Sequence, residues 1–363
     1  MITATVRRPA APGAFAHVAT QLDALVAAFG LDAEAIRIRA VYGAICRRAL
    51  AFPLGESRTG RSRLNEDGMP IQFATTVGPR PAALRFVADP GPFDAEGGAR
   101  MRAAHGAMRD AAELVGIEVE FAALAPFLAE LAPEDAPGLR ADPAGAFWIG
   151  AAFAPGAAPR LRVYVNGGWG GPAARSARLR RFAAHFDRAE AWDDLAAHLP
   201  AALAPLGLAL TLAPGGQVRG AIYLRAFGLR LSDYTGLARV ASGEADAERI
   251  RVFGAELLGA DAVHPTPSAV LSFGFGAEPG LPAELEFCAH CLYCDDTVAK
   301  AELERLFSSS RLDPAPYRAL ARALAPPVPQ AGPPRLHSFI GAYGKSAGPA
   351  YTVYMRPDLS AAR

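Results

Sequence analysis

Arginine and tyrosine residues recur two positions apart in three short stretches of the chain. Arg162 precedes Tyr164, Tyr223 precedes Arg225, and Tyr354 stands two residues before another arginine. Because side chains along a strand point alternately to opposite faces, residues two apart share one face. A guanidinium group binds phosphate oxygens bidentately, and a tyrosine ring attracts a cation to its face. Such a face suits a diphosphate whose departure leaves an allylic carbocation, provided that the surroundings exclude water.

These stretches belong to a repeated unit of two short strands around a turn rich in glycine and proline. The sequence predicts five such hairpins, over residues 70–89, 146–166, 208–225, 268–291 and 336–355. Apolar residues at helical spacing predict helices over residues 18–29, 100–114, 174–185, 192–199, 247–258, 298–307 and 315–324. Successive hairpins begin about 60–75 residues apart, a period that indicates a repeated supersecondary unit. The pattern therefore predicts an α+β fold with ten antiparallel strands.

The two faces of each predicted strand differ in character. Leu161, Val163 and Val165 share the face opposite Arg162 and Tyr164, and would pack on helices. A polar face in open water would accept Lys and Glu equally well, so the repeated Arg and Tyr favour an enclosed environment. Closing ten strands into a barrel removes the sheet edges and encloses a lumen. We expect a single domain over residues 1–363. It would be a closed barrel with a solvent-filled chamber inside and helices packed on its outside, including N-terminal helices within residues 1–60.

Several segments together resemble the aromatic prenyltransferases of the dimethylallyltryptophan-synthase type, most closely the short bacterial members. The first is Asp67-Gly-Met-Pro-Ile-Gln-Phe-Ala, followed by Ala83-Leu-Arg-Phe-Val-Ala-Asp-Pro-Gly91. The others are Leu161-Arg-Val-Tyr-Val-Asn166, Arg219-Gly-Ala-Ile-Tyr-Leu-Arg225 and Pro349-Ala-Tyr-Thr-Val-Tyr354. The similarity covers most of residues 60–358 in hairpin order. It implies the family's ten-stranded αββα (ABBA) barrel, which agrees with the hairpin count.

The resemblance implies transfer of a dimethylallyl or longer prenyl group from its diphosphate to an aromatic acceptor, by electrophilic aromatic substitution. The acceptor would be tryptophan, an indole derivative or a Trp-containing peptide, in secondary metabolism. No cofactor would be required, with Mg²⁺ at most stimulating the reaction. The positions that resemble the diphosphate-binding residues are Arg85, Arg162, Arg219 and Arg225. The positions that resemble the tyrosine shield around the cation are Tyr164, Tyr223 and Tyr354.

Gln72 is the most consequential departure from the family pattern, since the family usually has there a Glu that accepts the indole N–H. An amide accepts a hydrogen bond but cannot take a proton. We therefore expect weak turnover of free tryptophan, and more activity on simple indoles after Gln72→Glu. The opposing expectation is that Gln72 contacts its own acceptor through its N–H donors, a contact that a carboxylate would lose. Either the acceptor is unusual, or the base role passes to another group such as Glu284, Glu286 or His290. We take Gln72 and Glu286 as the candidate catalytic residues.

Composition excludes several other classes of protein. The 363 residues carry 37 Lys+Arg against 36 Asp+Glu, which gives no reason to expect a nucleic-acid or membrane-surface partner. No apolar run approaches the ~18 residues of a membrane span. We expect a cytoplasmic protein, monomeric or homodimeric, whose partners are its prenyl diphosphate and its aromatic acceptor.

Two rival functions depend on other features. Cys288, Cys291 and Cys294, with His290 among them, could ligate Zn²⁺ or an iron–sulfur cluster, which would make the barrel a non-catalytic metal- or ligand-binding protein. However, Cys288 and Cys291 would point to opposite faces of an extended strand. We therefore expect no metal site. A terpene cyclase on the same fold is the second rival, because ionisation of the diphosphate needs no aromatic acceptor.

Overall fold

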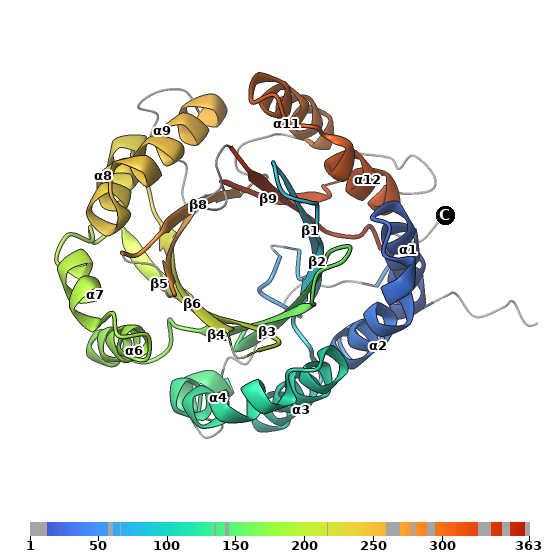
Figure 1. The fold of residues 1–363 in the computed structure, drawn as a ribbon. Helices are drawn as coiled ribbons and strands as arrows, with labels where there is room; N and C mark the ends of the chain where they lie inside the picture. The colour runs from blue at the N-terminus through green and yellow to red at the C-terminus, as the bar shows by residue number, and fades with distance from the viewer. Residues whose placement is uncertain are drawn as a thin grey trace, which may run out of the picture.

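Ten antiparallel strands form one closed barrel in the computed structural model of the protein, with helices arranged around its outside (Figure 1). The structure describes residues 13–56, 61–65, 67–133, 136–141, 145–215, 217–258, 269–276, 280–288, 295–325, 335–342 and 349–359. Around the barrel the strands follow the order β1-β10-β9-β8-β7-β6-β5-β4-β3-β2, so each pairs with its neighbours in the chain and β1 pairs with β10. The predicted barrel of five hairpins is confirmed.

The strands are β1 (Ile71–Val77), β2 (Leu84–Ala88), β3 (Phe147–Phe153), β4 (Arg160–Asn166), β5 (Leu203–Ala213), β6 (Gln217–Ala226), β7 (Ala269–Phe275), β8 (Ala283–Cys288), β9 (His337–Ala342) and β10 (Tyr351–Met355). The α-helices are α1 (Ala14–Ala28), α2 (Ala35–Cys46), α3 (Gly97–Val115), α4 (Glu118–Leu131), α5 (Pro137–Ala141), α6 (Pro172–Ala184), α7 (Ala189–Ala196), α8 (Leu231–Ser242), α9 (Glu244–Leu258), α11 (Asp296–Ser309) and α12 (Ala315–Leu324). A short 3₁₀ helix covers Asp32–Glu34.

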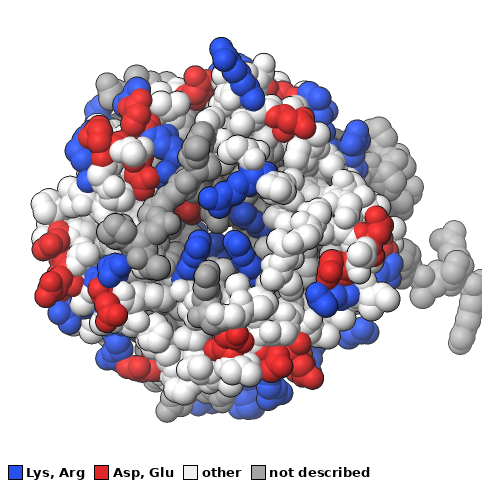
Figure 2. Space-filling model, viewed as in Figure 1, with Lys and Arg blue, Asp and Glu red and all other residues white. Residues whose placement is uncertain are grey.

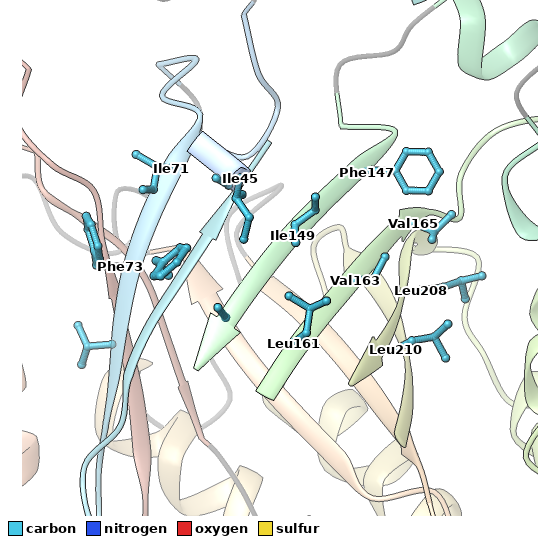
Figure 3. Close-up of a cluster of buried hydrophobic side chains, with 14 of the residues drawn as sticks. Ile45, Ile71, Phe73, Phe147, Ile149, Leu161, Val163, Val165, Leu208 and Leu210 are labelled. Carbon is cyan, nitrogen blue, oxygen red and sulfur yellow. The ribbon is translucent and has the colours of Figure 1, made fainter. Parts of the chain in front are cut away.

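The main hydrophobic core lies between the barrel and the helices. Leu161, Val163 and Val165 of β4 are fully or almost fully buried there, as their alternation predicted. Figure 3 shows them with apolar side chains of β1, β3 and β5 and with Ile45 of α2. Each such side chain contributes about 1.5–3 kcal/mol to stability by leaving water. Packing of this face therefore fixes which face of every strand points inward.

The N-terminal helices α1 and α2 complete the ring of helices. In Figure 1 they lie between α12 and α3, over the part of the barrel formed by β1, β2 and β3. Helices were expected over 1–60, but helical spacing of apolar residues located only the one over 18–29, since Ile36 and Ile38 alternate with arginines as they would in a strand. Helical geometry instead leaves Ile36 88% exposed and buries Ile38. No helix in the described ranges combines the length and the apolar character needed to cross a membrane.

A buried ion pair fixes the loop that leads into β1. The carboxylate of Asp89, at the end of β2, accepts hydrogen bonds from Arg100 Nη2 (2.8 Å), Ser62 Oγ (3.0 Å) and the Gly145 amide (3.3 Å). Both charged side chains are more than 90% buried, and the Arg100 guanidinium also stacks on Phe93, 4.5 Å from its ring centre. Helix α3, two loops and strand β2 are therefore joined at one point.

Candidate active site

Arg162, Tyr164 and Tyr223 form a cluster on the inner face of the barrel. The Arg162 guanidinium donates a hydrogen bond to the Tyr223 hydroxyl and lies 5.2 and 5.6 Å from the ring centres of Tyr164 and Tyr223. The two rings are tilted against each other, with centres 5.9 Å apart. A cation is thus already held by two aromatic faces inside the barrel, which is the environment predicted for these residues.

Apolar side chains line the wall beside this cluster. Ala209, Ala221 and Val270 pack with Tyr223 in a second buried cluster, separate from the core outside the barrel. Tyr164 and Phe339 are half-buried at the edge of this cluster. The alanine and valine side chains of this wall offer no hydrogen bonds to water, a property that suits the surroundings of a reactive carbocation.

Two carboxylates face the same lumen from β8. Glu284 and Glu286 are two residues apart and half-buried, and they are the only carboxylates in the ten described strands. The Tyr354 hydroxyl donates a hydrogen bond to Glu286 Oε1 at 2.9 Å. Gly341 is opposite Glu286 on β9, where a Cβ atom would lie 2.7 Å from Glu286 Cγ. The absence of a side chain at position 341 therefore gives Glu286 its space.

The surroundings of the two carboxylates make them weaker acids. Burial, with a smaller contribution from the charge of Glu284, raises the pKa of Glu286 to about 7, although Tyr354, Arg162 and Arg85 act in the opposite direction. Burial also raises the pKa of Glu284, against the positive charges of Arg162, Arg249 and Arg85. At neutral pH Glu286 is therefore present in both protonation states, as a group that stores and returns a proton must be.

The remaining predicted arginines lie on the inner face at different heights. Arg85 on β2 is half-buried and lowers the pKa of Glu284, Glu286 and Tyr354, so its charge acts on the centre of the lumen. Arg219 is exposed and is separated from Arg162 by Thr211 on the intervening strand. Arg225 is half-buried and is related to Glu286 through Val270.

Figure 2 shows the molecule along the barrel axis, where the face is hollowed at its centre and blue Lys and Arg side chains lie around the hollow.

The structure brings together Arg162, Tyr164 and Tyr223, and brings Tyr354 to Glu286. No described contact joins Arg219 or Arg225 to them. Glu284 and Glu286, two of the three candidates for the base role, lie in the same lumen, where the charges of Arg162 and Arg85 act on them.

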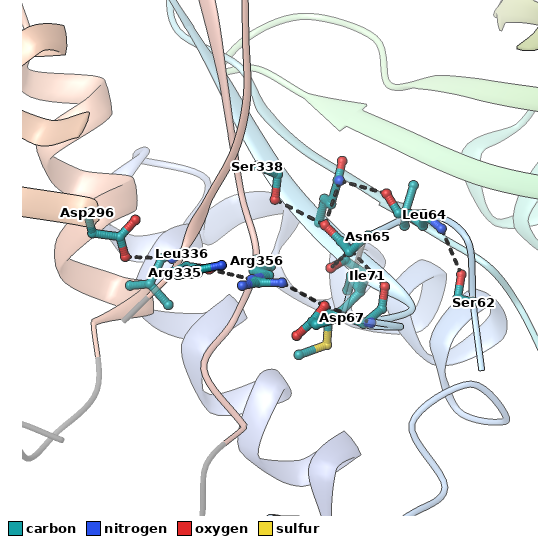
Figure 4. Close-up of polar contacts among 12 residues, drawn as sticks. Ser62, Leu64, Asn65, Asp67, Ile71, Asp296, Arg335, Leu336, Ser338 and Arg356 are labelled. Atoms are coloured by element: carbon teal, nitrogen blue, oxygen red, sulfur yellow. Dashed lines mark hydrogen bonds and ion pairs between the residues drawn. The ribbon is translucent and has the colours of Figure 1, made fainter. Parts of the chain in front are cut away.

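Gln72 of β1 is held by a hydrogen-bond network with Leu64 and Asn65, and Figure 4 labels these two residues together with Ser338. The Gln72 side chain is only 3% exposed, and its Nε2 donates to the Leu64 carbonyl (3.1 Å) and to Asn65 Oδ1 (2.7 Å). Asn65 is fixed in turn, since its Nδ2 donates to the Met69 and Ile71 carbonyls and its Oδ1 also accepts from Ser338. Both N–H groups of Gln72 are therefore used, and no described residue donates to its Oε1.

Asn65 and Ser338 were not predicted from the sequence. A single Asn in a polar loop is typical of a turn and indicates no further role. Asn65 and Ser338 are also separated by most of the chain, so no local pattern predicts their contact. The network favours the second of the two expectations for Gln72, in which its N–H donors are needed.

We expect Gln72→Glu to destabilise the protein by about 1–3 kcal/mol at pH 8, because an ionised carboxylate would face two oxygen acceptors. That environment raises the pKa of the introduced group, so the loss of stability should grow as the pH rises from 5 to 8. Urea denaturation at both pH values measures it, with Gln72→Met as the uncharged control of similar size. A Gln72→Glu protein as stable as Gln72→Met at pH 8 would contradict the network.

The cysteine motif is only partly described. Cys288 is buried, whereas His290, Cys291 and Cys294 lie outside the described residues. Within the described part of the chain, no group of three or more His, Cys, Asp or Glu side chains is arranged to hold a metal ion.

A separate cavity of about 360 Å³ lies between α3 and α4, outside the barrel. Its lining residues are Arg102, His105, Gly106, Arg109, Phe121, Ala125 and Leu128. None of them is among the predicted site residues or on the inner face of a strand, so the barrel lumen remains the candidate site.

The barrel, with its five hairpins and outer helices, is the fold of the ABBA prenyltransferases. Among solved structures, the chain is similar to 5-dimethylallyltryptophan synthase from Streptomyces coelicolor, at 22% identity over 97% of this chain and 100% of that one (TM-score 0.81). It is also similar to 6-dimethylallyltryptophan synthase from Micromonospora olivasterospora in complex with DMASPP and Trp, at 20% identity over 96% and 98% of the two chains (TM-score 0.79). A third is the prenyltransferase PriB with L-tryptophan and dimethylallyl thiolodiphosphate, at 21% identity over 97% and 98% (TM-score 0.81).

No protein-family model matches the chain, and the search of curated proteins finds no match. At identities of 20–22%, the likeness to these structures establishes the fold. The function has to be argued from the residues in the lumen.

Proposed function

We propose that this protein is an aromatic prenyltransferase, which transfers a prenyl group from its diphosphate to an aromatic acceptor by electrophilic substitution. The observation that carries the proposal is the Arg162–Tyr164–Tyr223 cluster inside the barrel. Its guanidinium can take diphosphate oxygens, and its rings can face the allylic cation that remains. The fold shared with three tryptophan prenyltransferases supports the same reaction.

The donor would bind with its diphosphate toward Arg162 and Arg85, whose charges act on the centre of the lumen. Its allylic carbon would lie against Tyr164, Tyr223 and Tyr354, within the apolar wall that limits access of water. Arg219 and Arg225 remain proposals as diphosphate ligands, since each would have to turn toward the donor.

Loss of a proton from the acceptor completes the substitution. Gln72 cannot take that proton, because an amide has no basic site at neutral pH. Glu284 and Glu286 are the carboxylates of the described strands, and Glu286 titrates near pH 7. We therefore assign the base role to this pair, with Glu286 as the member that Tyr354 orients.

The acceptor we propose is tryptophan, an indole derivative or a Trp-containing peptide, and the donor is dimethylallyl diphosphate or a longer homologue. An indole would present its N–H to Gln72 Oε1, the amide atom without a described donor. We expect no cofactor requirement, with Mg²⁺ at most stimulating. Nothing in the described residues favours the terpene cyclase or the non-catalytic barrel.

Mass spectrometry of reactions that pair allylic diphosphates with tryptophan, indoles and Trp-containing peptides tests this function. We expect an acceptor heavier by one prenyl group in at least one pairing, and prenyl alcohol as the main product when the acceptor is left out. Cyclised hydrocarbon or terpene alcohol formed without an acceptor would indicate the cyclase instead. Absence of any prenylated acceptor across the panel would reject the proposal.

A further inference from the structure

The two carboxylates of β8 pose an electrostatic problem for the proposed donor. Successive same-face residues on a strand lie ~7 Å apart, so Glu284 and Glu286 repel each other when both are ionised. The positive charges within the barrel that offset this repulsion at both carboxylates come from Arg162 on β4 and Arg85 on β2, and Arg249 outside the barrel acts on Glu284 alone. Arg162 and Arg85 carry the same guanidinium groups that the diphosphate would engage.

A bound diphosphate brings about three negative charges into this enclosed space. Its negative charge would cancel the effect of the Arg162 and Arg85 charges on the two carboxylates. It would also repel the carboxylates directly. The other groups that face Glu286 offset this poorly. Tyr354 on β10 donates one hydrogen bond, the pKa of Tyr223 on β6 is raised well above its usual value, and Gly341 on β9 has no side chain.

Arg225 on β6 and Arg249 on α9 complete the charges around the pair. Arg225 is two strands away from Glu286 in register, and Arg249 lies outside the barrel and donates to the Ala283 carbonyl. The charge of Arg249 lowers the pKa of Glu284, but Arg249 is paired with Asp246 at 2.6 Å, whose negative charge acts on Glu284 in the opposite direction. Arg225 has no described contact with either β8 carboxylate. The least costly response of the lumen to the donor is therefore to take up a proton.

We propose that the donor binds together with a proton held by Glu284 and Glu286, and that this pair returns the proton to the departing diphosphate and recovers one from the acceptor. The inference rests on the proposed function and assigns the pair two successive roles, acid and then base. In this proton transfer Tyr354 acts as a positioning residue, because its hydroxyl donates to Glu286 Oε1, while its ring would face the allylic carbon of the donor.

The proton balance of the reaction closes within the pair. The allylic C–O bond breaks with its electrons going to oxygen, and that oxygen takes the proton from the carboxylic acid. The cation then forms a bond to the acceptor ring, using one electron pair of the ring. The carboxylate removes the proton from the substituted ring atom, which restores aromaticity and regenerates the carboxylic acid. Diphosphate leaves with one proton, and the chemical steps that follow donor binding take none from solvent.

Titration calorimetry with dimethylallyl thiolodiphosphate, in two buffers of different ionisation heat, counts the protons taken up on binding. At pH 8, above the pKa of about 7 of Glu286, the wild type should take up close to one more proton than the Glu284→Gln/Glu286→Gln protein. Its affinity should also fall by about tenfold per pH unit above pH 7, a slope that the double variant lacks. Glu113→Gln, an exposed position on α3, should behave as wild type.

Tyr354→Phe provides a second test in case the double variant folds poorly. Removal of the hydroxyl raises the pKa of Glu286, because the lost hydrogen bond favoured the ionised form. The decline in affinity should therefore begin at a higher pH than in the wild type. Equal proton uptake by wild type and the double variant, or an unshifted decline in Tyr354→Phe, would overturn the inference. If the wild type fails to bind the analogue at all, the proposed function falls, and this inference falls with it.

Discussion

Replacing Arg162 by alanine is expected to weaken donor binding by about a hundredfold or more. A bidentate contact to the diphosphate supplies two charge-assisted hydrogen bonds, each worth ~1.5–3 kcal/mol. The variant also leaves the Tyr223 hydroxyl without its donor and removes the cation from between the two rings. The KM for the prenyl diphosphate and the Kd for dimethylallyl thiolodiphosphate measure the effect.

Two further variants distinguish the bidentate geometry of Arg162 from its positive charge, and from the general effect of removing any positive charge from the protein. Arg162→Lys keeps the charge but loses the bidentate geometry, so it should fall between wild type and Arg162→Ala. Arg322→Ala removes an exposed guanidinium from α12 and should leave both constants unchanged. An unaltered donor Kd in Arg162→Ala would place the diphosphate elsewhere and remove the main support for the proposed function.

Replacing Arg100 by alanine is expected to lower the free energy of unfolding by about 3–5 kcal/mol, since it leaves the buried Asp89 carboxylate without its cation. Asp89 would keep its hydrogen bonds from Ser62 and Gly145, which cannot replace a full charge. Burial already raises the pKa of Asp89 against the opposing effect of Arg100. Urea denaturation at pH 7 followed by circular dichroism measures the loss.

The double variant Asp89→Asn/Arg100→Ala should regain part of that stability, because no uncompensated charge remains. Arg102→Ala, at an exposed position two residues away on α3, should change stability by less than about 0.5 kcal/mol. A loss in Arg100→Ala no larger than this control would show that Asp89 is neutral in the folded protein.

The strands could be predicted from the sequence because their period of two is local. Helices were harder to predict where local patterns conflicted with packing, as in α2. Strand β5 begins at Leu203, whereas the sequence predicted a start at 208. The predicted start was too late because Pro205 interrupts the apparent strand pattern. The barrel accommodates this proline where the register between β5 and β6 shifts, a place where a strand tolerates a missing N–H.

For the candidate site too, residues set by a local pattern could be predicted, whereas contacts set by packing could not. Arg162, Tyr164 and Tyr223 could be found because strand alternation places them on the inner face. Glu286 was a candidate only because Gln72 cannot take a proton from the acceptor. The partners that orient Gln72 could not be predicted, since Asn65 and Ser338 meet only after the barrel has closed. Nor could a sequence pattern show that the charges of Arg162 and Arg85 act on Glu284 and Glu286, because that depends on strands far apart in the chain.

Closure of the barrel through β1 and β10 has a consequence for how the protein is made. Phe73 pairs with Met355, and Val77 with Tyr351, so the last seam joins segments about 280 residues apart. A contact of such high order forms late and slowly. Until β10 emerges from the ribosome, the growing sheet has two open edges that can pair with other chains. We infer that the yield of folded protein depends on how well those edges are protected during synthesis.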